Sequence, residues 1–270
     1  MIEINRYGEI VQMMMGREMD GSVLYWTAAY LVDGLLIDTG CAYTADELAE
    51  YIGGQQVNVV VNTHHHEDHI GANYIFQKQG LPLYAHPLAL PLINKRLPLR
   101  EYQEMVWGYP EPTQALPVPE TIVTENYTFR VLETPGHSSD HISLFEPEQG
   151  WCFSGDLFVS ENQKMLRADE DIAGIIASLE KLLTLPVEEL TLFTSIGRVF
   201  TEGKSVLRRY LDYLDELRGQ VHRLAGENLP PAEIRDRIFG RETQLAALTG
   251  GHFSVLNLVE QLTGLAEGSS

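Results

Sequence analysis

Metal-ligand side chains gather in one short segment of this 270-residue chain. Residues 63–69 read Thr-His-His-His-Glu-Asp-His and directly follow the β-branched run VNVVV, which is typical of a strand buried on both faces. Imidazole and carboxylate side chains together suit zinc, iron or manganese, and α/β folds place their sites at the ends of such strands. The pattern therefore predicts a metal site at this strand end. The spaced candidate ligands are His64, His66, Asp68 and His69.

Strand and helix patterns alternate around this segment, and that order predicts an α/β domain. Strands are expected at 23–34, 35–40, 57–63, 81–86, 127–136, 141–147, 151–158 and 189–197. Helices are expected at 44–54, 73–80 and 171–185, the first with Thr44 as its N-cap.

The rest of the chain divides into a helical end and one proline-rich segment. Helix patterns at 205–227, 230–240 and 253–264 predict a helical extension over 203–266, packed on a body of residues 1–202 and followed by a tail at 267–270. Segment 87–120 holds seven prolines. It is either a lid or binding loop, or a packed surface excursion that does not touch substrate.

Composition limits the classes of partner. The formal net charge of -19 argues against nucleic acid and anionic membrane, since both would be repelled. No apolar run has transmembrane length, and the N-terminus has no signal-peptide core, so a small-molecule substrate and a cytoplasmic location are expected. The two cysteines are expected to be free thiols. Nothing constrains the oligomeric state, and a homodimer is compatible with the helical extension.

The spacing His64-x-His66-x-Asp68-His69 resembles the H-x-H-x-D-H signature of the metallo-β-lactamase superfamily. Three further stretches resemble that superfamily's other motifs, and they occur in the same order. They are LLIDTG with Asp38, TPGHSSDH with His137 and SGDLF with Asp156. The resemblance implies a four-layer αβ/βα sandwich with a helical C-terminal extension, and the activity of a metal-dependent hydrolase.

The resemblance also implies a set of ligands. One metal would be held by His64, His66 and His137, the second by Asp68 and His69, and Asp156 would bridge both. Two Zn²⁺ ions are the first expectation, with iron or manganese as alternatives. A metal-activated hydroxide would attack substrate while Asp68 orients the water or passes on its proton. Asp38 and His141 would hold the ligands in position rather than ligate.

The sequence departs from the superfamily pattern after the strand ELTLF. A G-H-G-like turn usually follows, and its histidine completes the second metal site. Here the turn reads Thr-Ser-Ile-Gly, with Ile196 at the expected position, and isoleucine cannot ligate. Either the second site is weak or empty, or another group fills it. His252, in a glycine-rich turn, is the best substitute; alternatively it lies in the first turn of a helix capped by Ser254.

Three functions remain open. The leading hypothesis is hydrolysis of an ester, lactone, thioester or related acyl bond. The second is a mononuclear iron oxidoreductase of the sulfur-dioxygenase kind, because loss of one histidine suits a single-metal site with open positions. The third is a metal-binding protein without catalysis. The charged tract 167–171 is interpreted as a solvated loop and helix start.

Overall fold

The computed structural model describes residues 1–265, which form two compact units. The sheet unit contains residues 1–133, 139–156 and 186–201, and the helix unit contains 134–138, 157–185 and the chain from Glu202 onward. The expected boundary at 202/203 lies next to the last point at which the chain passes from the sheet unit to the helix unit, between Thr201 and Glu202. Residues 134–138 and 157–185 nevertheless group with the C-terminal helices, because helix α5 (Ile172–Leu183) packs against them. The predicted tail at 267–270 lies outside the described residues.

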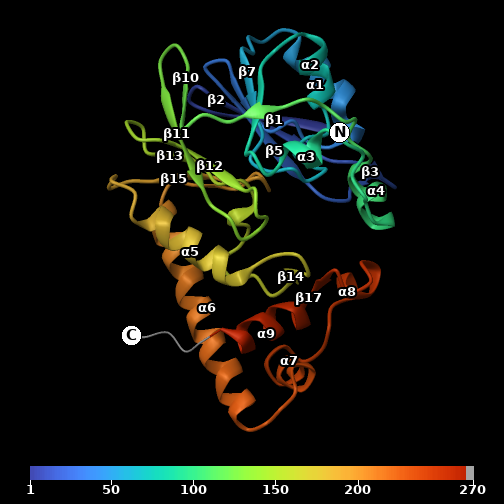
Figure 1. Cartoon of the computed structure of the whole chain (residues 1–270), viewed down its shortest axis with the longest axis vertical. Coiled ribbons are helices and arrows are strands. Elements are labelled where there is room, and N and C mark those ends of the chain that lie inside the picture. Colours follow the sequence, from blue (N-terminus) through green and yellow to red (C-terminus); the bar gives the residue numbers. More distant parts are fainter. Residues whose placement is uncertain (266–270) are drawn as a thin grey trace. The chain divides into compact units, whose positions relative to one another are not determined.

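The first sheet of the sheet unit has seven strands in the order β1-β2-β5-β6-β7-β8-β9. Strands β1, β2, β5 and β7 of this sheet are labelled in Figure 1. Neighbours from β1 to β6 pair antiparallel, and those from β6 to β9 pair parallel. A two-stranded hairpin, β3 (Glu18–Met19) and β4 (Ser22–Val23), precedes β5. The bounds of the seven are β1 Ile2–Tyr7, β2 Ile10–Met15, β5 Thr27–Val32, β6 Leu35–Ile37, β7 Val59–Val61, β8 Leu83–Ala85 and β9 Leu116–Pro117.

The second sheet has six strands in the order β10-β11-β12-β13-β15-β16. Only β13 and β15 pair parallel in it. In the first half of β11, the buried Phe129 lies between the exposed Thr128 and Arg130, as expected of a strand with one face on a core. The bounds are β10 Thr121–Val123, β11 Thr128–Glu133, β12 Ile142–Glu146, β13 Trp151–Phe153, β15 Thr191–Phe193 and β16 Val199–Phe200.

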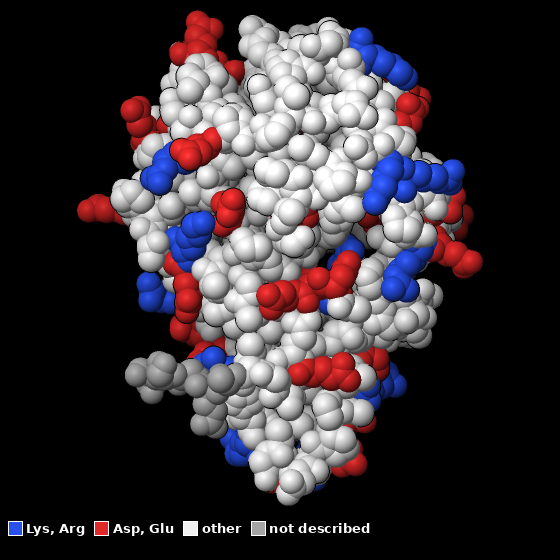
Figure 2. All heavy atoms as spheres, viewed as in Figure 1, with Lys and Arg blue, Asp and Glu red and all other residues white. Residues whose placement is uncertain are grey.

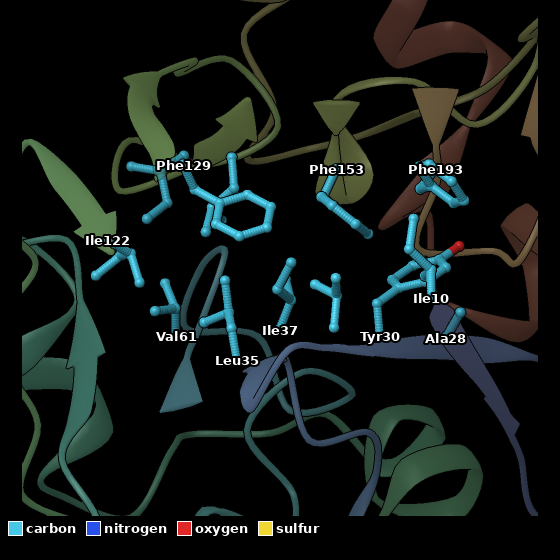
Figure 3. Packing of buried hydrophobic residues seen from close by; sticks show 13 residues of the cluster. Ile10, Ala28, Tyr30, Leu35, Ile37, Val61, Ile122, Phe129, Phe153 and Phe193 are labelled. Atoms are coloured by element: carbon cyan, nitrogen blue, oxygen red, sulfur yellow. The ribbon is translucent and has the colours of Figure 1, made fainter. Parts of the chain in front are cut away.

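The two sheets face each other across one apolar core (Figure 3). Tyr30 and Ile37 reach into it from the first sheet, and Phe129, Phe153 and Phe193 reach in from the second. The rings of Phe153 and Phe193 stack at 4.9 Å, and Tyr30 meets Phe153 edge-on at 5.2 Å. Such close packing fixes the two sheets, and hence the loops at their ends, relative to each other.

Helices α1 (Ala45–Ile52) and α2 (Asn73–Lys78) cover the outer face of the first sheet. Leu48 and Phe76 pack there against Val60 of β7. Thr44 does lie at the N-cap of α1, but its side chain does not cap the helix. Its hydroxyl instead donates to the carbonyl of Cys41, within the 3₁₀ turn Ala42–Thr44.

Segment 87–120 is more ordered than its prolines indicated. It forms α3 (Leu90–Ile93), α4 (Glu101–Trp107) and the edge strand β9. Ile93 and Leu97 pack with Ile70 in a small apolar cluster. The buried Gln103 donates from Nε2 to Oε1 of the buried Glu67 at 2.7 Å, so the segment contacts the histidine loop directly. A role as a lid stays a prediction.

The helix unit contains five helices among the described residues. All three predicted C-terminal helices are present, and α8 was not anticipated. Two short strands, β14 (Leu166–Arg167) and β17 (Phe253–Ser254), pair antiparallel within this unit. The helices are α5, α6 Gly203–Gly226, α7 Pro231–Phe239, α8 Gln244–Leu248 and α9 Val255–Gly264.

The facing sheets, the helices on the outer face of the first sheet and the C-terminal helices confirm the expected fold class. No helix within residues 1–265 combines the length and the apolar character needed to cross a bilayer. Both cysteines, Cys41 and Cys152, are free and buried, as expected, and burial raises the pKa of each thiol.

Candidate metal centre

The loop that leaves β7 buries all four predicted ligands of the cluster. Nε2 of His64 and Nδ1 of His66 lie 2.9 Å apart, so the two imidazoles present nitrogens to one point. Asp156, in the turn after β13, offers a carboxylate oxygen to the same group, and these ligand atoms lie within 4.8 Å of one another. The arrangement matches the nitrogen and oxygen donors that zinc and related ions take.

A second group of possible ligands shares Asp156 with the first. It consists of Asp68, His69 and Asp156, whose ligand atoms also lie within 4.8 Å of one another. Nε2 of His69 is 3.6 Å from Oδ2 of Asp68 and 3.4 Å from Oδ1 of Asp156. This buried nitrogen has no hydrogen-bond partner among residues 1–265, and a divalent cation would satisfy it.

Electrostatics at the second group also favour a cation. Burial opposes the charged form of His69, but the carboxylates of Asp68, Asp38 and Asp156 outweigh it and raise the pKa of His69 well above its ordinary value. Burial, together with the negative charges of Asp156 and Glu67, raises the pKa of Asp68 despite the opposing effect of His69. Negative charge is thus concentrated where a metal would replace a proton.

Asp38 accepts hydrogen bonds from the start of the histidine loop. It follows β6 with a left-handed backbone, φ 61°, which aspartate tolerates. Oδ1 accepts from the backbone N–H of Thr63 at 2.7 Å, and Oδ2 accepts from the Thr63 hydroxyl at 2.8 Å. Oδ2 also lies 2.8 Å from Nδ1 of His69, which leaves Nε2 as the ligand nitrogen.

A buried amide pair, which the motif analysis missed, fixes the backbone of the same loop. Asn62 and Asn73 exchange hydrogen bonds at 2.8 and 3.1 Å, and Nδ2 of Asn62 also donates to the carbonyl of His69. The hydroxyl of Thr39 lies 2.9 Å from the Asn73 side chain. An asparagine at the end of an otherwise apolar strand was the available sequence signal, because buried amides need partners.

His141 contacts the backbone of Asp156. The backbone N–H of Asp156 donates to Nε2 of His141 at 3.1 Å. Gly155 has φ 50°, and a Cβ there would lie 2.5 Å from that same nitrogen, so glycine is required. His65 has its Nδ1 2.9 Å from Oδ1 of the buried Asp140, and its ring meets that of His66 edge-on at 4.8 Å.

The turn after β15 presents to Asp156 a different residue from the one aligned with the missing histidine. Ile196 was expected at that position, but it is Ser195 whose hydroxyl donates to Oδ1 of Asp156. Strand geometry gives the reason: the N–H of Ser195 donates to Gly155 and its carbonyl accepts from Ala28, which directs the side chain toward Asp156. The residue against the metal carboxylate is therefore one position earlier.

In the helix unit, His137 is oriented by a carboxylate that the sequence interpretation overlooked. Oε1 of Glu170 lies 2.6 Å from Nδ1 of His137, and both side chains are buried. The other oxygen of Glu170 accepts from the backbone N–H of Arg167. The interpretation of tract 167–171 as solvated is therefore wrong for Arg167 and Glu170, because their hydrogen bonds compensate for burial.

His252 pairs with a carboxylate of the same unit. Its Nε2 lies 3.3 Å from Oδ1 of Asp169, a carboxylate that also accepts two hydrogen bonds from the guanidinium of Arg167. Among residues 1–265, neither group of possible metal ligands includes His252. Ser254 does cap α9, by accepting from the N–H of Asn257 at 3.0 Å, as the alternative interpretation expected.

Asp169→Asn should lower the free energy of unfolding by about 1 kcal/mol at pH 7, because the carboxylate is half-exposed. Burial opposes the charged form, but hydrogen bonds from His252 and Arg167 outweigh it and hold the pKa of Asp169 well below its usual range. A lowered folded-state pKa gives stability that is present above the unfolded value of about 3.9 and is lost as the pH falls below it. Urea unfolding at pH 7, 5 and 3 measures this. If wild type and variant differed by the same free energy of unfolding at pH 7 and at pH 3, the prediction would be contradicted. Asp212→Asn, at an exposed position of α6, is the control.

Comparison with known proteins places this geometry in context. Residues 27–192, more than half of the chain, match the family model described as the metallo-beta-lactamase superfamily. A hydroxyacylglutathione hydrolase of Legionella pneumophila (strain Paris) is 30% identical over 141 residues, 50% of this chain but only 47% of that relative. The probable metallo-hydrolase YqjP of Bacillus subtilis is 24% identical over 89% of this chain and 91% of its own. A metallo-beta-lactamase family protein of Thermus thermophilus has a TM-score of 0.64 at 19% identity, covering 94% and 91% of the two chains.

Proposed function

Because the chain belongs to the metallo-β-lactamase superfamily, we propose that it is a metal-dependent hydrolase of an ester, lactone, thioester or related acyl bond. One observation carries the proposal: two groups of possible ligands, buried except for the partly exposed Asp156, share the carboxylate of that residue. A shared carboxylate places two cations close enough to act on one bond. The relatives include a hydroxyacylglutathione hydrolase and a probable metallo-hydrolase, which supports hydrolysis without fixing the substrate.

We assign the first cation to His64, His66 and Asp156, whose ligand atoms lie within 4.8 Å of one another, and, from the superfamily motif alone, to His137. Since Nδ1 of His137 faces Glu170, ligation would use Nε2. The second cation would take Asp68, His69 and Asp156. We propose zinc for the first set because three imidazoles with a carboxylate suit it. His252 is left out of both sets, since its imidazole pairs with Asp169.

Bound divalent cations would lower the pKa of water to about 7 and polarise the scissile carbonyl. The residues of this chain would supply proton transfer and the positioning of the ligands. Asp68 lies beside the shared carboxylate, and its raised pKa suits a group that accepts a proton and passes it to the leaving atom. Asp38 keeps Nε2 of His69 directed at the site, and His141 holds the backbone of Asp156.

The surface charge supports a small substrate rather than a polyanion. Figure 2 shows Lys and Arg in separate small groups with Asp and Glu between them on the face in view. A net charge of -19 disfavours long anionic partners. A cytoplasmic location and a homodimer remain part of this proposal.

Metal analysis combined with a substrate panel tests the proposal. The protein, purified without chelator, should contain divalent metal and hydrolyse at least one chromogenic ester, thioester or lactone. Activity should disappear with a chelator and return when zinc is added back. Metal-loaded protein that hydrolyses none of these would overturn the hydrolase assignment. Bound iron with oxygen consumption would favour the sulfur-dioxygenase alternative, and full occupancy with neither activity would favour a binding protein.

His137→Ala should reduce the affinity of the first site for Zn²⁺ by at least about tenfold, because one of its three imidazoles is removed. The measurement is competition with a fluorescent zinc chelator. His222→Ala removes an imidazole on α6 that bonds the carbonyl of Leu262 instead, and serves as the matched control. Unchanged zinc affinity in His137→Ala would contradict the assignment of His137.

A further inference from the structure

We infer that Ser195 takes the place of the missing imidazole ligand and makes the second metal site much the weaker of the two. The inference rests on the proposed function, since it concerns the metals of that same site. It starts from one contact: the Ser195 hydroxyl donates to Oδ1 of Asp156. That oxygen is the one 3.4 Å from Nε2 of His69. Ser195 therefore faces the second ligand group.

The turn that carries Ser195 is held from several directions. Its N–H donates to Gly155 and its carbonyl accepts from Ala28 at 2.5 Å. The hydroxyl of Tyr30 donates to the carbonyl of Thr194 at 2.5 Å, and Nε2 of Gln12 donates to Gly197 at 2.8 Å. Ser195 itself is only 3% exposed. These hydrogen bonds fix the direction of the side chain at position 195. Whatever functional group it carries therefore lies against the carboxylate of Asp156.

The two ligand groups consequently differ in donor chemistry. The second group offers one imidazole and two carboxylates, from His69, Asp68 and Asp156. A neutral hydroxyl is a poor ligand for zinc, and the hydrogen bond from Ser195 draws electron density from the shared carboxylate. The first group includes two imidazoles within the sheet unit alone, His64 and His66. Zinc should therefore fill the first group well before the second.

Titration of metal-free protein with Zn²⁺, by calorimetry and chelator competition, measures this difference. The wild type should bind one ion tightly and a second at least about 100-fold more weakly. Ser195→His should tighten the second step at least about tenfold, because it supplies the absent imidazole. Ser205→His, on the exposed surface of α6, adds the same side chain elsewhere and should leave both steps unchanged.

Ser195→Cys provides a test that does not depend on accommodating a larger side chain. The thiol is nearly isosteric with the hydroxyl, and its thiolate ligates metals strongly. Two equivalents of Co²⁺ added to this variant should give a sulfur-to-cobalt charge-transfer band in the near-ultraviolet. The wild type should lack this band. Two equally tight zinc ions in the wild type, or no such absorption in Ser195→Cys, would overturn the inference. Because these readouts are of metal alone, a protein that hydrolyses nothing would refute the proposed function and leave the inference on Ser195 standing.

Discussion

Asp68→Asn is expected to lower kcat by about 1,000-fold at saturating metal, within the range for loss of a positioned acid–base group. The amide keeps the shape of the side chain but can neither accept a proton nor carry negative charge. Asp68 is buried beside His69 and near the shared carboxylate of Asp156, so the change removes a proton acceptor from the second ligand group. The measurement is steady-state hydrolysis of the best substrate from the panel, over a range of added zinc.

The zinc series separates the two ways in which this variant can fail. If activity recovers at high zinc, Asp68 acts mainly as a ligand; if it stays low with both sites filled, Asp68 acts on the proton. Asp46→Asn, an exposed residue of α1, makes the same chemical change outside the site and should retain full activity. A kcat for Asp68→Asn within about tenfold of the wild type would refute the proton-transfer role.

Asp38→Ala is expected to lower the free energy of unfolding by about 3–5 kcal/mol, as for other buried charged groups that lose their partner. The change leaves the N–H and hydroxyl of Thr63 and Nδ1 of His69 without their acceptor. Metal affinity should also fall by about 10- to 100-fold, because the His69 ring is no longer held toward the site. Urea unfolding of metal-free protein and zinc competition measure the two effects separately.

Asp33→Ala is a matched control for this variant. Asp33 also has a left-handed backbone, φ 48°, and its carboxylate also accepts two hydrogen bonds, both from Asn126. Its bonds lie at the exposed surface and contact no candidate ligand, so we expect a small loss of stability and unchanged zinc affinity. Equal losses in the two variants would show that backbone strain, rather than support of His69, explains the effect of Asp38→Ala.

The histidine loop was predictable because its information is local. The loop after an apolar strand carries four candidate ligands within six residues, so their short spacing alone brings them together. They are His64, His66, Asp68 and His69. The strands next to the histidine loop followed from their apolar runs, and the C-terminal helices from their amphipathic period. Strands β1, β2, β10 and β16 were not anticipated. Asp38 and His141 could be assigned supporting roles because they lie within recognisable motifs, and their contacts agree with those roles.

Other parts of the site depend on contacts between distant segments, which no local pattern encodes. Ser195 was not singled out, because a serine is unremarkable until the turn after β15 is anchored to Gly155 and Ala28. Glu170 was interpreted as solvated, because its partner His137 is 33 residues away in the sequence. His252 was a plausible ligand by type, and only the position of Asp169 shows where its imidazole is paired.

The sequence by itself therefore determined the fold class, the family resemblance and the candidate ligands of the histidine loop, because those depend on residue type and short spacing. The tertiary structure decided which residue faces Asp156 across the second ligand group, which carboxylate orients His137, and that segment 87–120 reaches the loop through Gln103 and Glu67. The physical reason is that hydrogen bonds and ion pairs act over a few ångströms, and only the folded chain brings these side chains within that distance.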